Sequence, residues 1–186
     1  MSMPAVSSRA RANGTAQPLW DAVLELPFGK VGLRCTAAEV QELEYLPDAT
    51  PPVPPASSLA REVLAQLLSY CGNPRHRFDL PLAAAGTPFQ RRVWALLVET
   101  PCGTARTYGE AARKLGSAAR AVGQACAANP HAPVIPCHRV VAVTGLGGFA
   151  HSLDPGGELL RIKRWLLQHE GAVLTFVKAK RWDGGA

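Results

Sequence analysis

The first half of the chain alternates hydrophobic and polar positions over short runs. One run covers residues 20–26 and a second covers residues 31–35, with Phe28-Gly29 between them. A side-chain period of two is typical of strands that bury one face, so this pattern predicts a β-hairpin. A third strand is expected over residues 40–46. The proline-rich stretch 47–55 that follows excludes a helix or a central strand and predicts a loop.

The spacing of the apolar residues becomes helical in the middle of the chain. They recur every three or four positions between residues 57 and 71, and Gly72-Asn73-Pro74 supplies a stop. A short strand is expected over residues 78–82. Thr87-Pro88-Phe89-Gln90 then has the pattern of a capping box with proline at the first helical position, which predicts the start of another helix. We place a domain boundary near Gly86.

Two short helices with a tight turn between them are predicted next. Thr107-Tyr108-Gly109-Glu110 is a second capping box, and its helix stops at Gly116. Ser117 is expected to cap the following helix, residues 118–128, in which small residues surround one long cation, Arg120. Such a pair has the outline of a helix-turn-helix, which occurs in ordinary cores as well as in DNA-binding proteins. The small side chains favour DNA binding, because they let the helix backbone approach a sugar-phosphate backbone or a narrow groove.

Charge is distributed unevenly along the chain. The chain has 186 residues, and 47% of them are hydrophobic. Residues 1–86 carry 7 Lys+Arg and 8 Asp+Glu, whereas residues 87–186 carry 13 and 6. This asymmetry favours a polyanionic partner for the second half, although a positive charge by itself also serves solubility. A chain of this size can bury one core or two small ones.

The sequence lacks the features of a membrane or secreted protein. No apolar stretch approaches the about 20 residues that cross a bilayer, and the start of the chain lacks the hydrophobic centre of a signal peptide. We therefore expect no membrane partner and a cytoplasmic location, in a bacterium beside the nucleoid, or a nuclear one in a eukaryote.

The cysteines argue against a disulfide framework and against a metal site. The chain has 5 of them, widely spaced and without a CxxC motif. Cys35, Cys71 and His76 show no spacing typical of zinc ligands, so no metal is predicted. Cys102 and Cys126 are interpreted as small packing residues. A reducing compartment fits this usage.

Cys137 is the strongest candidate for chemistry, because it lies within Pro136-Cys137-His138-Arg139-Val140. Cysteine acts as a nucleophile only as the thiolate, and a nearby imidazolium or cationic side chain lowers its pKa. Adjacent side chains of an extended segment point to opposite faces, so a water between Cys137 and His138 is more reasonable than a direct bond. The pentapeptide alone leaves the substrate open: a peptide bond, an amide or a metal would each fit.

These residues together resemble the O6-alkylguanine-DNA alkyltransferases, also called methylated-DNA-protein-cysteine methyltransferases. The resemblance covers Thr87 to Gly171. It runs in order through Pro88-Phe89-Gln90, Val93-Trp94, Tyr108-Gly109, Ala119-Arg120-Ala121-Val122-Gly123, Asn129-Pro130, Pro136-Cys137-His138-Arg139-Val140 and His169-Glu170-Gly171. The first half fits the family's small sheet domain less specifically, through the segment from Leu26 to Cys35.

The resemblance implies an α+β fold of two domains. A small N-terminal antiparallel-sheet domain, RNase H-like, would cover residues 18–86. A C-terminal helical domain of the winged-helix or helix-turn-helix kind, with the active site, would cover residues 87–177. Residues 1–17 are expected to be a disordered tail and residues 178–186 a basic tail.

The resemblance also implies the activity: a single-use transfer of an alkyl group from O6 of guanine to Cys137. His138 would act as base through a water and Glu170 would orient it, as in a catalytic triad. Thiolate suits attack at an sp3 carbon, and water does not hydrolyse the resulting thioether, so each molecule should act once. No cofactor is expected.

The DNA contacts and supporting residues follow from the same resemblance. The target base must leave the duplex, and Arg120 matches the residue that fills the gap. Tyr108 would contact the base and crowd the adjacent phosphate. The slim helix face would lie in the minor groove of double-stranded DNA, and the protein would bind as a monomer or as several copies along the duplex. The helix face consists of Ala119, Ala121 and Gly123, and the active-site support of Asn129, Pro136, Arg139, Val140 and Phe149.

The loop over residues 147–157 departs from the family pattern. It is longer than expected, and Phe149 replaces a tyrosine. Ala150 or Ser152 is a candidate for the contact with the substrate oxygen. The range of alkyl groups that fit is therefore open.

Three other functions remain as alternatives. A relative that binds alkylated DNA without repairing it would lack the acceptor cysteine, which this chain has. A cysteine hydrolase using Cys137, His138 and Glu170 would leave the helix pair unexplained. A helix-turn-helix regulator would need polar side chains to read bases, and the helix over residues 118–128 supplies few.

Overall fold

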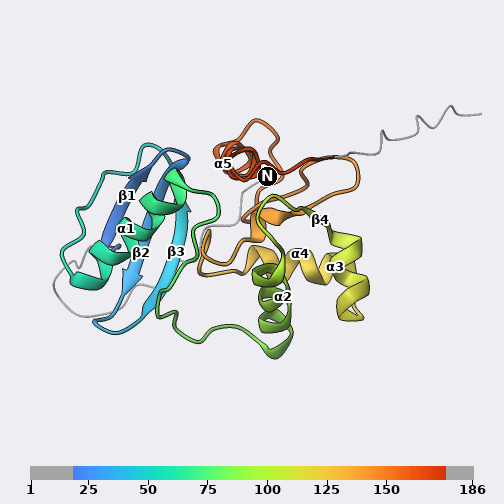
Figure 1. The fold of residues 1–186 in the computed structure, drawn as a ribbon, viewed down its shortest axis with the longest axis horizontal. Helices are drawn as coiled ribbons and strands as arrows, with labels where there is room; N and C mark the ends of the chain where they lie inside the picture. The colour runs from blue at the N-terminus through green and yellow to red at the C-terminus, as the bar shows by residue number, and fades with distance from the viewer. Residues whose placement is uncertain (1–18, 175–186) are drawn as a thin grey trace, which may run out of the picture.

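The structure is a computed structural model that describes residues 19–174. The tails predicted over residues 1–17 and 178–186 lie outside the described residues. In Figure 1 a sheet and one helix lie together at the left of the molecule, and the other four helices form a group beside them at the right. We call these parts the sheet half and the helical half.

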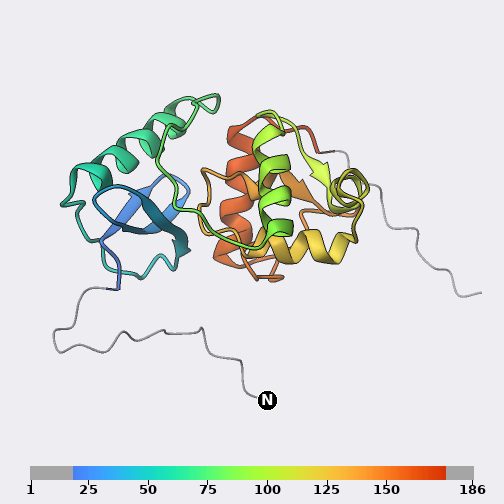
Figure 2. The ribbon, with the colours of Figure 1, turned by 90° about the horizontal axis from the view of Figure 1, so that it is seen from below.

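The sheet half contains the three strands that the alternating pattern predicts. They are β1 (Ala22–Leu26), β2 (Gly29–Cys35) and β3 (Val40–Leu46), all antiparallel, in the order β1-β2-β3. Helix α1 (Ser58–Gly72) packs against β1 and β2, and Figure 2 shows it lying across the sheet. The Ser57 hydroxyl accepts a hydrogen bond from the Ala60 backbone N–H at 3.0 Å, which fixes the start of the helix.

The strand expected over residues 78–82 is wrong. These residues have no strand structure apart from a single parallel bridge between Leu82 and Val40. The Val40 N–H donates to Pro81 at 2.7 Å, and the Val40 carbonyl accepts from Ala83 at 2.9 Å. Pro81 itself has no N–H to donate, so the ladder cannot continue, and the segment instead connects the two halves.

The helical half contains four α-helices among its described residues. They are α2 (Pro88–Glu99), α3 (Tyr108–Leu115), α4 (Ala119–Ala127) and α5 (Glu158–His169). Both predicted capping boxes are confirmed, at Thr87 with Gln90 and at Thr107 with Glu110. Two short strands, β4 (Arg106–Thr107) and β5 (Val140–Val141), pair in parallel and tie the start of α3 to the segment after Cys137.

Ser117 does not cap α4, contrary to the prediction. Ala118 occupies the N-cap position and makes no side-chain hydrogen bond. The reason lies at the end of α3, where Gly116 adopts a left-handed conformation (φ 62°) and the Ser117 N–H donates to the Ala112 carbonyl at 2.9 Å. This closing turn of α3 uses Ser117, so α4 begins two residues later.

The two halves share a continuous core and several backbone bonds. Leu43 in β3 donates its N–H to Pro130 at 2.7 Å, and the buried His131 ring lies 3.1 Å from the Val40 carbonyl. The predicted α+β class is confirmed by this mixed fold with its small antiparallel sheet. The RNase H-like and winged-helix assignments stay predictions.

A candidate active site around Cys137

Cys137 begins a short 3-10 helix, η1 (Cys137–Arg139), and only 6% of its surface is exposed. The extended segment expected here is wrong, because the Arg139 N–H bonds to Pro136 at 3.1 Å and the Val140 N–H bonds back to Cys137. The thiol lies where two cavities meet. One, of about 770 Å³, reaches α4 and the loop after Leu146, and another, of about 290 Å³, reaches β3.

His138 is buried with one ring nitrogen paired and the other free. Its Nε2 lies 2.9 Å from Oε1 of Glu170, whereas Nδ1 has no hydrogen-bond partner among residues 19–174. Burial lowers the pKa of His138 below its ordinary value, although Glu170 opposes this. A neutral ring that donates from Nε2 keeps an unshared electron pair on Nδ1. Nδ1 is therefore the atom able to accept a proton.

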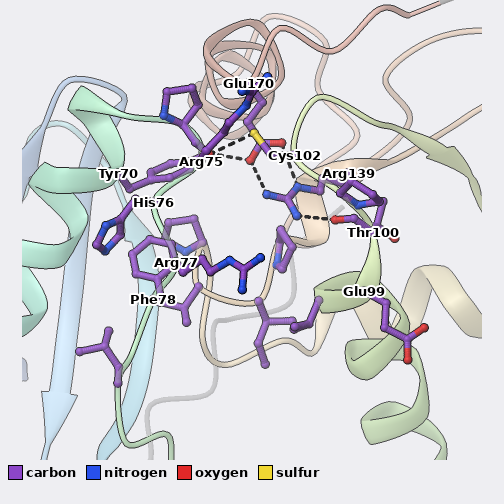
Figure 3. A pocket seen from close by; sticks show the side chains of 18 of the residues that line it. Tyr70, Arg75, His76, Arg77, Phe78, Glu99, Thr100, Cys102, Arg139 and Glu170 are labelled. Carbon is purple, nitrogen blue, oxygen red and sulfur yellow. Dashed lines mark hydrogen bonds and ion pairs between the residues drawn. The ribbon is translucent and has the colours of Figure 1, made fainter.

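Glu170 follows α5 at its C-cap and is held by three side chains. The Arg139 guanidinium donates to both carboxylate oxygens at 2.8 Å, and the Tyr70 hydroxyl donates to Oε1 at 2.9 Å. Figure 3 shows Tyr70 and Arg139 converging on Glu170, with a further Arg139 bond to the Thr100 carbonyl. Burial opposes ionisation of this carboxyl, but the bonds from His138 and Arg139 outweigh it and hold its pKa well below the usual range.

Tyr70 was not predicted as a site residue, and it comes from α1 in the sheet half. Its ring lies edge-on to His169 at 5.3 Å, and its carbonyl oxygen lies 2.7 Å from the His169 ring nitrogen. Its position continues the apolar stripe of Val63 and Leu67, so in sequence it looks like a core residue. No local signal links it to a carboxylate 100 residues later.

Lys163 is a second residue that the site prediction left out. Its buried ammonium donates to the carbonyls of Val140 and Leu146 at 2.6 Å and of Gly148 at 3.0 Å. Burial lowers the pKa of Lys163 to about 8. The sequence signal was a lysine on the apolar face of α5, between Leu160 and Leu166.

The environment of the thiol keeps it protonated at rest. Burial raises the pKa of Cys137, while a hydrogen bond from Asn129 and the charge of Lys163 act in the opposite direction. Asn129 also joins α4 to the active-site segment, since its amide donates to Ile135 at 2.8 Å and accepts from the His131 N–H at 3.0 Å. The expected lowering by a neighbouring cation and by N–H groups is present but smaller than the effect of burial, so the net pKa is raised and a base must remove the proton during reaction.

The predicted DNA-contacting residues border the larger cavity, with one exception. Arg120 is exposed on α4, and the Tyr108 hydroxyl donates to the Gly148 carbonyl at 3.0 Å. Ala119 and Gly123 line the same cavity, whereas Ala121 does not. The slim face of α4 and Cys137 therefore line the same cavity of about 770 Å³.

The loop over residues 147–157 covers this cavity from the other side. Phe149 is buried, with its ring centroid 5.2 Å from that of Tyr45, and Phe149 and Ser152 exchange two backbone hydrogen bonds of 2.9 and 2.8 Å. Between them, Ala150 (φ 45°) and His151 (φ 67°) adopt left-handed conformations that are costly for residues with a Cβ. Both Ala150 and Ser152, the two candidates for the substrate oxygen contact, line the cavity.

The remaining cysteines have no metal-binding arrangement in residues 19–174, where no group of three or more His, Cys, Asp or Glu is placed to hold a metal ion. Cys102 donates its thiol to the Pro74 carbonyl at 3.0 Å. Cys126 lines both cavities beside Cys137, but burial raises its pKa to about 12. Neither side chain is poised as a nucleophile.

The exposed Arg120 of the helix pair and the buried Cys137 border one cavity, an arrangement that fits a class of protein that binds DNA and reacts through a cysteine. Comparison with known proteins agrees with this class. Residues 88–172 match the family described as "6-O-methylguanine DNA methyltransferase, DNA binding domain". This match, together with a relative that is 38% identical over 80% of this chain, shows that the chain belongs to the O6-methylguanine-DNA methyltransferase family.

Similar proteins cover both halves of the chain. The methylated-DNA–protein-cysteine methyltransferase of Methanosarcina barkeri is 38% identical over 156 residues, 80% of this chain and 94% of that protein. The one from Methanosarcina mazei is 46% identical over 113 residues, 59% of this chain and 67% of that protein. The structure of Mycobacterium tuberculosis OGT in complex with DNA is similar with a TM-score of 0.65 and 36% identity, over 80% of this chain and 91% of that one.

Proposed function

We propose that this protein repairs DNA by moving the alkyl group of O6-alkylguanine, such as the methyl group, onto its own Cys137. The observation that carries the proposal is the position of the thiol. Cys137 lines a cavity of about 770 Å³ that Arg120 and Tyr108 also border, and the next residue along the chain, the buried His138, is paired with Glu170. A cavity of this size is in the range that holds a small organic ligand.

The transfer would begin with loss of the thiol proton. His138 Nδ1 is the available acceptor, and a water between the two side chains would carry the proton. The thiolate then attacks the alkyl carbon, so that a sulfur–carbon bond forms as the carbon–oxygen bond breaks and the electron pair passes to O6. Guanine takes up a proton and is restored. The thioether product is stable to water, so each molecule acts once and needs no cofactor.

The base would reach the thiol by leaving the duplex. Arg120 is the exposed cation at the cavity edge, and we propose that it fills the gap from the minor groove while Ala119, Ala121 and Gly123 let α4 approach closely. Tyr108, which is fixed by Gly148, would contact the base and the adjacent phosphate. We propose binding as a monomer or as several copies along the DNA.

The supporting residues are proposed to hold the thiol segment in place. Asn129 bonds to Ile135, and Arg139 bonds to Glu170 and Thr100. Val140 pairs with Arg106, Pro136 begins the 3-10 turn, and Phe149 covers the cavity. A division near Gly86 into a sheet domain, residues 18–86, and a reactive domain, residues 87–177, also stays a proposal.

The proposed location is the cytoplasm of a bacterium, beside its nucleoid, or the nucleus of a eukaryote. Among the described residues, no helix has both the length and the apolar character needed to cross a membrane. The alternatives explain less. A hydrolase would not need the helix pair, and a base-reading regulator would not need the thiol, although both features border the same cavity.

Incubation with a duplex that contains O6-methylguanine is expected to add one methyl group to Cys137 and to restore guanine in equal amount. Mass mapping of the peptides would locate the methyl group, and Cys137→Ser should abolish transfer. Cys126→Ser is the matched control, because Cys126 borders the same cavity but its raised pKa keeps it protonated. An unmodified Cys137, or a methyl group on Cys126, would contradict the proposal.

Arg120→Ala is expected to slow repair of a duplex more than reaction with free O6-alkylguanine. Unstacking a base costs a few kcal/mol, so loss of the side chain that fills the gap should lower the duplex rate by about ten- to a hundredfold. Single-turnover kinetics on both substrates would measure the ratio. Arg164→Ala removes an exposed cation from α5 that does not line the cavity and serves as control. Equal losses on both substrates would remove the gap-filling role.

A further inference from the structure

Exposed side chains from two elements border the larger cavity. Arg120 comes from α4, and His151 and Leu153 come from the loop over residues 147–157. We call these three exposed residues the rim of the larger cavity. The proposed transfer gives Arg120 a role, whereas it uses neither of the exposed residues of the loop. This loop is also where the sequence departs from the family pattern.

Leu153 is the unusual member of the rim. It is 83% exposed, and among residues 19–174 it is the one large hydrophobic side chain that is both exposed and borders this cavity. A single exposed apolar residue is ordinary on a protein surface. Leu153 differs from such a residue because it lies where the extruded nucleotide of the proposed function has to enter. A nucleotide in the cavity would therefore remove the leucine from water, which is favourable.

The backbone against which Leu153 rests is fixed. A Cβ added at Gly148 would lie 2.8 Å from Leu153 Cδ2, so the leucine side chain lies against Gly148. The Gly148 carbonyl accepts hydrogen bonds from the Tyr108 hydroxyl and from the Lys163 ammonium, both at 3.0 Å. The residue after Leu153 donates its N–H to the Ser152 hydroxyl at 3.2 Å. A side chain on a support that is ordered before binding costs less conformational entropy to immobilise.

The composition of the loop indicates which part of a nucleotide it can contact. Residues 147–157 contain no lysine or arginine, so the loop offers no permanent cation to a phosphate. The guanine has to pass beyond the rim, because Cys137 is buried and lines the same cavity. The deoxyribose joined to that guanine remains at the rim, and its C–H groups present an apolar surface to Leu153.

We propose that Leu153 packs against the deoxyribose of the extruded nucleotide and holds that nucleotide in the larger cavity. Arg120 and Leu153 then act on different parts of the DNA. The arginine fills the gap that the base leaves, and the leucine contacts the sugar that leaves the duplex with the base. This inference rests on the proposed alkyl transfer to Cys137, and it adds a residue that binds the substrate of that site.

The test compares single-turnover rate constants for free O6-methylguanine, for its 2′-deoxynucleoside and for a duplex that contains it. The deoxynucleoside differs from the free base by the sugar alone. In Leu153→Ala the rate constant for the deoxynucleoside relative to that for the free base should fall by about three- to thirtyfold, as expected when most of a leucine contact is lost. The fall should come from a higher half-saturating concentration and not from a lower maximal rate, because the sugar takes no part in the bond exchange.

The duplex separates the two rim residues, and an exposed leucine elsewhere supplies the control. Arg120→Ala should lower the duplex rate constant relative to the deoxynucleoside one, because only the duplex leaves a gap to fill. Leu153→Ala should lower both by the same factor. Leu68→Ala removes an exposed leucine from α1 that does not border the cavity, so it should change neither ratio.

An unchanged ratio of deoxynucleoside to free base in Leu153→Ala, while the wild-type protein transfers methyl to Cys137, would overturn the sugar contact alone. A loss seen only with the duplex would do the same, since it would place the contact of Leu153 elsewhere on the DNA. Absence of methyl transfer from the duplex to Cys137 of the wild-type protein would overturn the proposed function and, with it, the role of Leu153.

Discussion

Glu170→Gln is expected to slow alkyl transfer by about a hundred- to ten-thousandfold, the range of general-base catalysis. The carboxylate orients the His138 ring and fixes the proton on Nε2, which leaves Nδ1 free to accept the thiol proton. An amide in its place presents a donor group where the carboxylate accepted several hydrogen bonds. Because burial keeps Cys137 protonated, loss of a correctly oriented base removes the route to the thiolate.

The same substitution should also destabilise the fold. The Arg139 guanidinium, now bonded to both carboxylate oxygens, would become a largely buried charge without its partner. Removal of one member of such a pair typically costs about 3–5 kcal/mol. Urea unfolding of unalkylated protein would measure this loss, and the rate should be compared under conditions where both proteins are folded.

Tyr70→Phe is a smaller change at the same carboxylate, and its effects on stability and rate are to be compared with those of Glu170→Gln. It removes one neutral donor from Glu170 and leaves the bonds from His138 and Arg139, so it should cost about 1 kcal/mol. The transfer rate should fall by less than about tenfold. A Tyr70→Phe variant as slow as Glu170→Gln would mean that the hydroxyl, not the carboxylate charge, orients His138.

The pH dependence of transfer distinguishes a changed His138 base in Glu170→Gln from a general loss of stability. His138 titrates below its ordinary pKa of about 6.5 because it is buried, and Glu170 raises the pKa toward that value. The wild-type rate should therefore decline only at pH values below about 6.5. In Glu170→Gln the charge that favours protonation is absent, so the decline should begin at a still lower pH. A shift to higher pH would contradict the assignment of His138 as base.

Local sequence patterns predicted most elements of this fold, and prediction failed where a backbone partner was missing or was already used by a neighbouring element. The capping boxes at Thr87 and Thr107 involve residues three positions apart, so they are visible in the sequence and occur as predicted. The strand expected over residues 78–82 depended on a partner, and only Leu82 finds one. Ser117 has the chemistry of a cap, but the end of α3 uses its backbone first.

The site was predictable where its residues form a contiguous motif. Cys137 and His138 are adjacent, and Glu170 lies in a second recognisable segment that the fold brings within 2.9 Å of His138. Tyr70 comes from the sheet half and looks like an ordinary core residue in sequence. Its bond to Glu170 depends on how the sheet packs against the helical half, which no pattern along the chain encodes.

Lys163→Met is expected to cost about 2–4 kcal/mol and to slow transfer by about ten- to a hundredfold. The ammonium bonds to three carbonyls that belong to the segments on either side of the larger cavity, at Val140, Leu146 and Gly148. Methionine fills similar space but leaves these acceptors without a donor. The loop that carries Phe149 would then lose its anchor to α5, and the cavity beside Cys137 would lose its defined shape.

Hydrogen exchange of residues 147–153, corrected for intrinsic rates, would test the anchor directly. Burial lowers the pKa of Lys163 to about 8, and deprotonation removes one of its three donors. Protection of the wild-type loop should therefore weaken as pH rises through about 8, whereas protection in Lys163→Met should be low throughout. Lys114→Met is the matched control, because the exposed Lys114 pairs with Glu99 only at 3.5 Å and such pairs contribute about 0–1 kcal/mol. Wild-type protection in Lys163→Met would show that Phe149 and its turn hold the loop without the lysine, and that the three carbonyl bonds do not shape the cavity.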